Sequence, residues 1–537
     1  MKSTHFIFFL IICCALLCQG CSQDDIVILY DNDVHCRIDS YANISAMKRS
    51  ALRFTDNVLV VSSGDFSQGG AIGSFTKGES VISIMNTVGY DVVTLGNHEF
   101  DYGFDRLRSN MTSLNADVTD CNLIETGTGK PLFAPFVIKD VDGRKIAFIG
   151  VTTPLAVTSS TPAFFMDENG NFKYGFCKDS IMTVIQNTVD KARKSGADYV
   201  IALSHIGVDE DIPGLSSYRI AAATSGIDVI LDGHSHTEIP CERLKNKDGR
   251  EVVLTQTGCY FKNIGRLTIS PTGEISTELI PLAEYNVKDS TVVGVIDSVS
   301  TEYNRFAGRL IALTEFPLPV DYKPDERTSR MRETPMGDLC ADAYRQVYGT
   351  DVGVLNAGTI RAGLVNSEIL FNDVYTAIPF GNNAVVLEMT GSTIADMLEY
   401  SVFLSPGPFG GFLQVSGLCF DADLTAASPV KLNETGMYDG IEGTRRVKNI
   451  RILNRENGKY EPLVPDRKYT VAGGEYILLN KGNGYTMFDS CEQPQHHPAY
   501  LTDYETLEVY LSKYLNGKVP ECYRKAQERI RFLDEKR

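Results

Sequence analysis

The sequence predicts a two-domain α/β protein. The chain has 537 residues, of which 43% are hydrophobic and 22% charged, as is typical of a soluble globular protein with room for two or three cores. Up to about residue 282, short β-branched runs alternate with stretches of helical spacing. Beyond a proline-containing break at 317–319, the chain resumes with a strand-like run of its own. The alternation indicates the α/β class, and the break indicates a second unit.

Five apolar runs in the first unit are predicted to be strands. They lie at 26–29, 58–61, 92–95, 199–203 and 227–231. Continuous apolar runs bounded by glycine and polar turns are typical of strands buried on both faces. Segments with helical spacing, such as 180–195, lie between them. Polar side chains follow each run, and ligands of α/β sheets bind at that carboxyl end of the strands.

A helix-like segment joins the two units. Apolar residues recur there at three- and four-residue spacing, at Val293, Ile296, Val299, Tyr303 and Phe306. Pro317 and Pro319 cannot continue a helix, so we expect a hinge near them. The expected organisation is a first domain over 22–284, a linker helix over 285–320 and a second domain over 321–537. The second domain contains a strand at 352–355 and a glycine-rich stretch at 407–417.

Residues 1–21 are predicted to be a signal peptide. Lys2 precedes an apolar run over 6–17, which is too short to span a bilayer. Gly20-Cys21, followed by an acidic stretch, resembles a bacterial lipoprotein cleavage site, which makes Cys21 a candidate lipid anchor. An ordinary secreted protein is the alternative. The expected localisation is therefore the periplasm, or the outer membrane or cell surface as a lipoprotein.

The charge balance argues against a stable nucleic-acid complex. Lys and Arg number 51 against 68 Asp and Glu, which gives a net charge of −17 and no basic footprint. An anionic small substrate would need another attraction, such as a bound metal ion. Of the 13 cysteines, nine lie beyond residue 21, without CxxC pairs or the density of a disulfide scaffold. Nothing in the sequence predicts a protein partner.

The histidines are the most informative residues. Of the eight, His5 lies in the predicted signal peptide, and His496 and His497 form an isolated pair. The other five each follow a predicted strand: His35, His98, His205, His234 and His236. Any one of them is as readily explained as a structural histidine. Five of them at strand ends indicate a shared site.

Carboxylates and an amide complete a donor set for two divalent metal ions. The set is Asp33, His35, Asp65, Asn97, His205, His234 and His236. Oxygen donors mixed with imidazole nitrogens suit Zn²⁺, Mn²⁺ or Fe better than Mg²⁺ or Ca²⁺. Two metal ions about 3.5–4 Å apart need a bridging ligand, and the lone carboxylate of Asp65 suits that role.

These residues carry a resemblance to a known family. DVH at 33–35, GD at 64–65, GNHEFD at 96–101, SH at 204–205 and GHSH at 233–236 resemble, in order, the five blocks of the calcineurin-like metallophosphoesterases. The resemblance implies a β-sandwich-type α/β domain. It also implies one metal ion on Asp33, His35, Asp65 and His236, and the other on Asp65, Asn97, His205 and His234. Cys36 departs from the glycine usual in the 5′-nucleotidase branch, and we expect a small steric change there without loss of a ligand.

The same resemblance makes His98 and Asp101 the pair that faces the scissile phosphate. Two metal ions would neutralise the phosphate oxygens and lower the pKa of a bound water toward about 7, so that hydroxide attacks phosphorus. His98 would stabilise developing charge or protonate the leaving group, and Asp101 would fix its tautomer. A carboxylate at a helix start is the structural alternative for Asp101. Because no GxxxxGK[ST] motif occurs, a P-loop phosphotransferase is excluded.

The second unit resembles the C-terminal domain of the 5′-nucleotidase family. NAGTIR at 356–361, RMRE at 330–333 and PFGN at 379–382 are similar to three segments of that domain. The resemblance implies an α/β substrate-binding domain with five contact residues, Arg330, Asn356, Arg361, Phe380 and Asn483, although Phe380 has a plain core position as its alternative. In the last block, Ile477 stands where a base-stacking Phe is expected, and Asn483 replaces an Asp. Tyr476 and Tyr485 are the candidates for the second ring.

The predicted function is an exported phosphohydrolase with two metal ions that releases phosphate from nucleoside 5′-monophosphates. A 2′,3′-cyclic-nucleotide phosphodiesterase or a UDP-sugar hydrolase with the same metal centre is the first alternative, kept open by the GHSH block and by Ile477. A thiosulfohydrolase relative is a more distant one. From a different class, the chain could be a surface nucleotide-binding lipoprotein with a relic metal site, but such a protein has no need of the His98–Asp101 pair.

Overall fold

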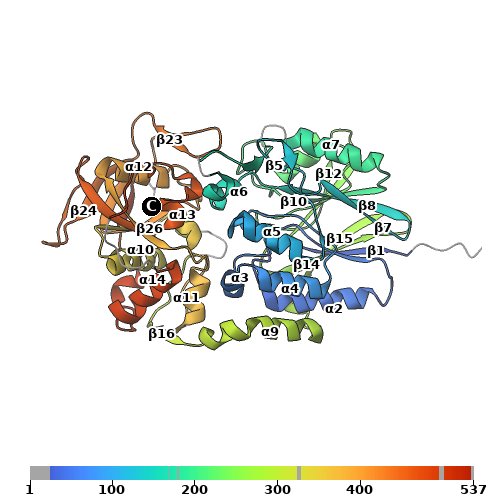
Figure 1. Ribbon diagram of the computed structural model, residues 1–537, viewed down its shortest axis with the longest axis horizontal. Helices are drawn as coiled ribbons and strands as arrows, with labels where there is room; N and C mark the ends of the chain where they lie inside the picture. Colours follow the sequence, from blue (N-terminus) through green and yellow to red (C-terminus); the bar gives the residue numbers. More distant parts are fainter. Residues whose placement is uncertain (1–23, 168–169, 178–180, 323–327, 495–500, 534–537) are drawn as a thin grey trace, which may run out of the picture.

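The protein folds into two lobes joined along one edge by a long helix (Figure 1). The computed structural model describes residues 24–167, 170–177, 181–322, 328–494 and 501–533. The predicted signal peptide, Cys21 and the pair His496 and His497 lie outside these residues. Among the described residues, no helix has the length and apolar character that a bilayer crossing requires. The predicted two-domain α/β class is confirmed.

Two six-stranded sheets form the N-terminal lobe, in the orders β15-β14-β1-β2-β3-β4 and β12-β13-β11-β10-β8-β7. The first sheet consists of β1 Ile26–Asp31, β2 Val58–Ser62, β3 Val92–Val93, β4 Asp117–Val118, β14 Asn263–Ile269 and β15 Ile275–Pro281. The second consists of β7 Phe136–Val141, β8 Arg144–Thr152, β10 Tyr199–His205, β11 Val229–Leu231, β12 Glu238–Lys245 and β13 Glu251–Thr257. β1 to β4 are parallel, as are β8, β10, β11 and β13. All five predicted strands are present among them.

Helices cover the outer faces of both sheets, which gives a four-layer sandwich. On the first sheet they are α2 Tyr41–Ala51, α3 Ala71–Thr76, α4 Glu79–Val88 and α5 Gly103–Ser113. On the second they are α7 Ile181–Lys194 and α8 Ser217–Ala223. Aliphatic and aromatic side chains from both sheets, such as Ile28, Phe148 and Leu203, fill the layer between them. This central core holds the strand ends of the two sheets in a common register.

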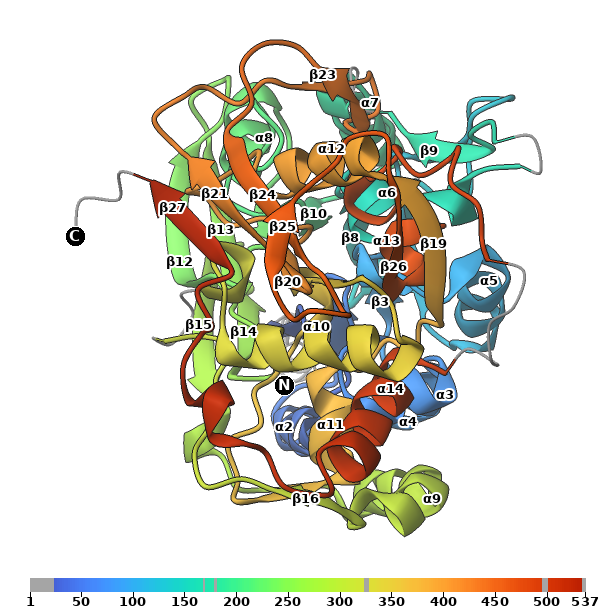
Figure 2. The same cartoon turned by 90° about the vertical axis from the view of Figure 1, so that its left-hand side faces the viewer.

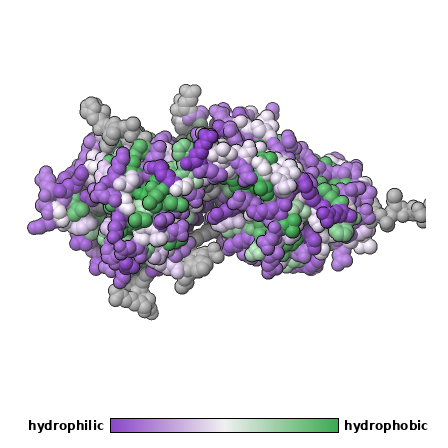
Figure 3. All heavy atoms as spheres, turned by 90° about the horizontal axis from the view of Figure 1, so that it is seen from below, coloured by the Kyte–Doolittle hydropathy of each residue, from purple (hydrophilic) through white to green (hydrophobic). Residues whose placement is uncertain are grey.

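The C-terminal lobe contains two four-stranded sheets, β19-β26-β17-β20 and β25-β24-β21-β27 (Figure 2). Their strands are β17 Val352–Asn356, β19 Ala384–Thr390, β20 Leu413–Ser416, β21 Leu418–Asp423, β24 Val447–Leu453, β25 Tyr460–Pro462, β26 Lys468–Gly474 and β27 Ile530–Leu533. The main helices are α10 Pro335–Tyr348, α11 Phe371–Ala377, α12 Gly391–Ser401, α13 Glu475–Leu478 and α14 Asp503–Val509. Smaller strand pairs are β16 Leu310–Leu313 with β18 Glu368–Leu370, and β22 Val430–Leu432 with β23 Tyr438–Ile441. Hydrophilic residues surround small apolar patches on the face of both lobes seen in Figure 3.

Helix α9, Ser290–Ala307, forms the connection between the lobes. The Asp289 carboxylate caps its first turn by accepting the Thr291 N–H at 2.8 Å. Val292 and Ile296 pack into the N-terminal core, whereas the Tyr303 hydroxyl donates to Asn372 on α11 at 2.5 Å. The expected linker segment thus holds an 18-residue helix, followed directly by the short strand β16. Because α9 contacts both lobes, it sets their separation along this edge.

Tyr30 ties the two sheets of the N-terminal lobe together. Its ring covers Gly265, its neighbour on β14, and its hydroxyl hydrogen-bonds the Thr255 hydroxyl on β13 of the other sheet at 2.6 Å. A Cβ at Gly265 would lie 2.0 Å from the Tyr30 ring. Only glycine therefore fits opposite this tyrosine.

We expect Gly265→Ala to destabilise the fold by about 1–3 kcal/mol, because the added methyl overpacks the sheet against Tyr30. Gly294→Ala is the matched control, since Gly294 lies inside α9 with open space around it, and alanine there should stabilise by about 0.5–1 kcal/mol. Urea unfolding measures both. Equal midpoints for the two variants would contradict the packing argument.

Candidate metal centre

The seven predicted ligands converge where strands of both sheets end. Asp33 and His35 follow β1, Asp65 follows β2, and Asn97 follows β3. From the other sheet, His205 ends β10, and His234 and His236 follow β11. The sandwich brings the two sets face to face, because all these strands point toward the same end.

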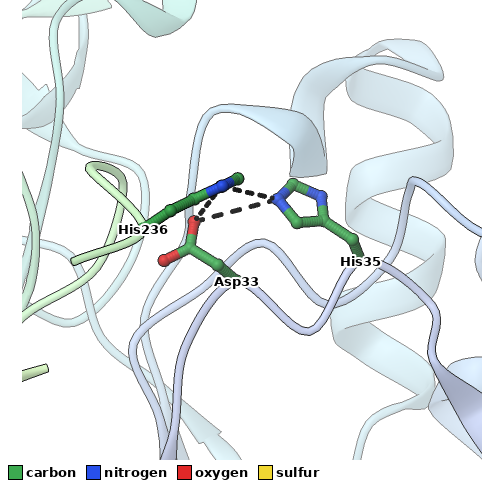
Figure 4. Close-up of side chains that lie close together, drawn as sticks. All are labelled: Asp33, His35 and His236. Carbon is green, nitrogen blue, oxygen red and sulfur yellow. Dashed lines mark hydrogen bonds and ion pairs between the residues drawn. The ribbon is translucent and has the colours of Figure 1, made fainter. Parts of the chain in front are cut away.

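Asp33, His35 and His236 form one side of the cluster (Figure 4). The Asp33 Oδ1 atom lies 3.4 Å from His236 Nε2, and the Nε2 atoms of His35 and His236 are 3.1 Å apart. On the other side, Asp65 Oδ2 lies 3.3 Å from His205 Nε2 and 3.8 Å from His35 Nε2.

Asn97 and His234 extend the second side, with Asn97 Oδ1 at 2.9 Å from His234 Nδ1. Asp33, Asp65 and His205 also offer ligand atoms that all lie within 4.8 Å of one another. Asp33 and Asp65 both lie near histidines of the two sides, and the bridging role of Asp65 stays a prediction.

Five of the seven predicted ligands have a left-handed backbone. They are Asp33, His35, Asp65, His234 and His236, with φ between 48° and 74°. Side chains other than glycine rarely adopt this conformation, and it costs of order 1–3 kcal/mol at each position. The surrounding structure must therefore hold these loops in place.

Glu99 holds two of these loops in place through hydrogen bonds, although the sequence had predicted no role for it. Its buried carboxylate accepts the N–H groups of Asp65 at 2.8 Å and Gly96 at 2.6 Å, and those of the next two residues after Asp65. It therefore fastens the GD loop to the GNHE loop. Asn32 has a similar role, since its amide donates to Asp33 Oδ2 at 2.7 Å.

Backbone carbonyls orient two of the histidines. His205 Nδ1 lies 2.7 Å from the Ser63 carbonyl, and His35 Nδ1 lies 3.2 Å from the Gln68 carbonyl. Since Nδ1 donates to a carbonyl, Nε2 is the ring atom that faces the cluster in each histidine. Tyr260 encloses the same region, with its ring 5.3 Å from that of His35 and 5.8 Å from that of His236. Neither Gln68 nor Tyr260 lies in a block that the sequence analysis recognised.

The cluster holds two ionised carboxylates. Burial raises the pKa of Asp33 and of Asp65, but His205 and the other nearby histidines outweigh burial and lower both. Burial lowers the pKa of His205, yet Asp65 and Asp33 raise it to about 10. Burial and neighbouring histidines lower the pKa of His234 to about 3. The site therefore attracts positive charge and keeps His234 neutral, ready to bind a metal ion.

The residues present fit a pair of divalent metal ions. Asp33 Oδ1 and His205 Nε2 are buried without a hydrogen-bond partner, although both belong to the cluster. A metal ion is the ligand that satisfies an orphaned carboxylate oxygen and an orphaned imidazole nitrogen together. The donors are oxygen and nitrogen, without a thiolate.

His98 and Asp101 form the predicted pair at the edge of the cluster. His98 Nδ1 lies 2.7 Å from Asp101 Oδ2, and the His98 backbone N–H donates to Asp65 Oδ1 at 2.8 Å. Burial lowers the pKa of His98, but Asp101 and Asp65 outweigh it, so that the pKa is raised. The pair therefore favours a protonated imidazole whose Nε2 is free to donate.

The C-terminal lobe brings Phe380 and Arg361 over this pair. The Phe380 ring lies 6.3 Å from that of His98, and the Arg361 guanidinium lies 5.9 Å from the Phe380 centroid. Phe380 is half-buried at the lobe boundary. Asn356 Nδ2 lies 3.3 Å from Asn483 Oδ1, and the Arg330 carbonyl accepts the Phe409 N–H at 2.9 Å. Asn356 is the last residue of β17, and the other four predicted substrate residues lie outside the strands and α-helices of the C-terminal lobe.

In the segment 476–485, the side chains of Ile477 and Tyr485 are buried. Ile477 is 2% exposed in the core of the lobe, and Tyr485 is 1% exposed with its hydroxyl donating to the Gly411 carbonyl at 2.8 Å. Tyr485 is therefore excluded as the second stacking ring. Tyr476 lies at the lobe boundary and hydrogen-bonds the N-terminal lobe.

Cys36 is accommodated by two glycines. A Cβ at Gly73 would lie 1.9 Å from Cys36 Sγ, and one at Gly70 would lie 3.0 Å from Cys36 Cβ. Burial raises the pKa of the Cys36 thiol to about 12. The thiol donates to the Phe66 carbonyl at 3.4 Å and stays outside the ligand cluster.

The fold and site define a two-lobed protein with a candidate dinuclear metal centre at the lobe boundary. Residues 311–490 match the family model described as 5′-nucleotidase, C-terminal domain. Residues 44–253 match the model described as bacterial capsule synthesis protein PGA_cap. A solved structure of a 5′-nucleotidase precursor from Thermus thermophilus is similar, with a TM-score of 0.76, 24% identity and coverage of 95% of this chain and 100% of that one. Sulfate thiohydrolase SoxB of Thermus thermophilus has a TM-score of 0.68 at 19% identity, covering 95% of this chain and 97% of that one.

Named relatives are similar over most of the chain. The snake venom 5′-nucleotidase of Gloydius brevicauda is 27% identical over 88% of this chain and 84% of its own length. The NAD 5′-nucleotidase of Haemophilus influenzae is 24% identical over 89% and 85%. The trifunctional nucleotide phosphoesterase YfkN of Bacillus subtilis is 24% identical over 93% of this chain, which spans 34% of that protein. Residues 311–490 thus match a 5′-nucleotidase C-terminal domain, the chain is similar to 5′-nucleotidases over most of its length, and the resemblance inferred from its motifs is confirmed.

We expect Asp65→Ala to abolish binding of at least one metal ion, because its carboxylate lies near histidines of both sides of the cluster. Metal content after reloading with Mn²⁺ or Zn²⁺ and desalting measures this. Asp31→Asn is the matched control, since Asp31 is an equally buried carboxylate two residues from Asp33 that instead accepts the Tyr90 hydroxyl. Full metal content in Asp65→Ala would exclude Asp65 as a ligand.

The loop that carries Phe380 gives a pH-dependent prediction. Asp503 accepts the N–H groups of Gly381 at 3.2 Å and Asn382 at 3.3 Å. Burial raises the pKa of Asp503 from 3.8 to about 7, against these hydrogen bonds. The folded state favours the protonated Asp503 carboxyl, whereas the same carboxyl in the unfolded chain ionises near its usual pKa. Its contribution to the free energy of unfolding is fully present below pH 4 and is lost as pH rises toward 7.

Asp503→Asn should therefore be less pH-sensitive than the parent protein. The free energy of unfolding of the asparagine variant, measured relative to that of the parent, should be about 2–4 kcal/mol higher at pH 8 than at pH 4. The reason is that an amide carries no charge to bury. Urea midpoints at both pH values measure this. Parallel pH profiles for the two proteins would show that Asp503 does not titrate in this range.

Proposed function

We propose that this protein is a phosphohydrolase with two divalent metal ions that releases phosphate from nucleoside 5′-monophosphates. The observation that carries the proposal is the juxtaposition of the ligand cluster, the His98–Asp101 pair and the Phe380–Arg361 pair across the lobe boundary. The printed names of the relatives, 5′-nucleotidases and a nucleotide phosphoesterase among them, support the same reaction class.

The cluster would hold one ion on Asp33, His35, Asp65 and His236, and the other on Asp65, Asn97, His205 and His234. When bound, such ions act as Lewis acids on phosphate oxygens and lower the pKa of coordinated water. The mixed oxygen and nitrogen donors favour Zn²⁺, Mn²⁺ or Fe. Glu99 and Asn32 keep Asp65 and Asp33 aimed at the site.

His98 would donate a proton from Nε2 to the leaving ribose oxygen. Asp101 accepts the Nδ1 proton at 2.7 Å, which fixes the tautomer and favours the imidazolium form. Water would add its oxygen to phosphorus and lose a proton to solvent. As the P–O bond to the ribose breaks, the bonding pair would pass to the leaving oxygen and the His98 proton would neutralise it.

Arg361 would bind the substrate beside the scissile phosphate, and Phe380 would stack on the nucleobase. Asn356 and Asn483 would bond the ribose or the base, and Arg330 would contact the nucleotide from the same end of the lobe. Tyr485 and Ile477 are buried, and the Tyr476 hydroxyl is bonded to the N-terminal lobe, so the last block lacks the stacking Phe that the resemblance implies. This observation favours a second candidate function with a looser nucleoside site: hydrolysis of 2′,3′-cyclic nucleotides or UDP-sugars at the same metal centre.

The cellular location of the protein is part of the same proposal. Export with residues 1–21 as a signal peptide, and attachment through a lipid on Cys21, would place the enzyme where extracellular nucleotides are degraded. These residues lie outside the described part of the chain. Their support is the apolar run at 6–17 and the Gly20-Cys21 pair.

We expect the mature protein, reloaded with Mn²⁺ or Zn²⁺, to release phosphate from AMP faster than from an aryl phosphate. It should also hydrolyse AMP faster than it opens 2′,3′-cyclic AMP to the monophosphate or cleaves UDP-glucose to UMP and glucose 1-phosphate, with the products separated by chromatography. His98→Ala should lower kcat on AMP by about 10²- to 10⁴-fold because it removes the proton donor. Its metal content should stay at the parent level, since the ligands remain. A parent protein that binds metal but hydrolyses none of the four substrates would instead indicate a nucleotide-binding protein.

A further inference from the structure

One side chain of the C-terminal lobe, Tyr476 on α13, hydrogen-bonds the N-terminal lobe beside the His98–Asp101 pair. Its hydroxyl lies 3.1 Å from the carbonyl oxygens of both Thr158 and Ser159, at the end of helix α6, Ala156–Ser159. A second contact crosses the same boundary, since the Ala163 N–H donates to the Asn480 carbonyl at 3.4 Å. α6 and α13 lie next to each other at the boundary of the lobes in Figure 1.

On the C-terminal side, the same hydroxyl fixes Asn483. The Asn483 N–H donates to Tyr476 Oη at 3.2 Å, while the Tyr400 hydroxyl donates to the Asn483 carbonyl at 2.8 Å. Asn483 has a left-handed backbone, with φ of 52°, so its conformation depends on such partners. The Tyr476 ring packs closely over Gly482, where an added Cβ would lie 2.5 Å from it.

On the N-terminal side, the bonded carbonyls belong to a segment near Asp101. Ser160, the residue after Ser159, is 1% exposed, and its side chain lowers the pKa of Asp101, although its hydroxyl makes no hydrogen bond within the described residues. Asp101 in turn holds His98 at 2.7 Å. One hydroxyl group therefore links the loop of Asn483 to the segment that packs against the His98–Asp101 pair.

We propose that Tyr476 is a positioning residue that holds the substrate-binding loop of Asn483 in register with the His98–Asp101 pair across the lobe boundary. The proposal rests on the proposed function and adds the group that aligns its two halves. Tyr476 touches neither the ligand cluster nor the reacting atoms in this arrangement. Its effect is therefore confined to substrates that both lobes must hold.

The test compares Tyr476→Phe with the parent protein, both reloaded with metal. The phenylalanine ring keeps the packing on Gly482 but loses the hydrogen bonds to Thr158, Ser159 and Asn483. We expect KM for AMP to rise about three- to tenfold, the effect of losing one hydroxyl group whose single proton is shared between two carbonyls. An aryl phosphate, which needs only the metal centre and the His98–Asp101 pair, should be hydrolysed at the parent rate. Metal content should also be unchanged.

Tyr469→Phe is the matched control, because the buried Tyr469 hydroxyl accepts the Val464 N–H at 3.0 Å within the C-terminal lobe alone. It should leave AMP hydrolysis at the parent level. Equal losses on AMP and on the aryl phosphate in Tyr476→Phe, or equal KM values for the two variants, would overturn the proposal.

Hydrogen–deuterium exchange gives a readout that does not depend on activity. Tyr476→Phe should speed exchange in peptides that cover 156–165 and 480–485, and Tyr469→Phe should change neither. If the parent hydrolyses none of the substrates yet shows this exchange pattern, the proposed function fails and the boundary contact stands. Unchanged exchange in both segments would show that the Tyr476 hydroxyl does not hold them together.

Discussion

Two buried carboxylates that stay charged side by side determine much of the N-terminal lobe. Asp33 and Asp65 lie in one cluster, where their mutual repulsion is weakly screened. Such a pair persists only if positive charge lies in the same place. In the protein chain alone the neighbouring histidines supply that charge, and Asp65 and Asp33 in turn raise the pKa of His205 to about 10. Divalent ions at the same atoms supply more positive charge and satisfy the orphaned Asp33 oxygen as well.

The sandwich provides the rigidity that this arrangement requires. Each ligand loop begins at a strand held between two layers of core, so that the loops can adopt left-handed conformations that would relax elsewhere. Glu99 adds a brace by accepting several backbone N–H groups with one carboxylate. The strain at the ligands is thus offset by hydrogen bonds and apolar packing away from them.

The sequence was sufficient to predict the strands, the lobes and the seven clustered residues, because apolar runs and strand-end chemistry are local signals. The backbone conformation of Asp33 or His236 has no such signal, since tertiary contacts impose it. Glu99 was missed because its partners are backbone amides, which every residue has. Tyr476 was considered only as a stacking ring, because its partner Thr158 lies 318 residues away along the chain. Burial of Ile477 and Tyr485 is likewise a property of the packed lobe.

Cys36 and Gly73 occupy one shared volume beside the metal centre. The thiol fills the space where a side chain of α3 would project, and its raised pKa keeps it protonated, so that it does not compete with the histidines for metal. A substitution at 73 is therefore tolerated only together with one at 36. A methyl group at 73 requires glycine at 36, whereas glycine at both positions would leave a void against a ligand loop.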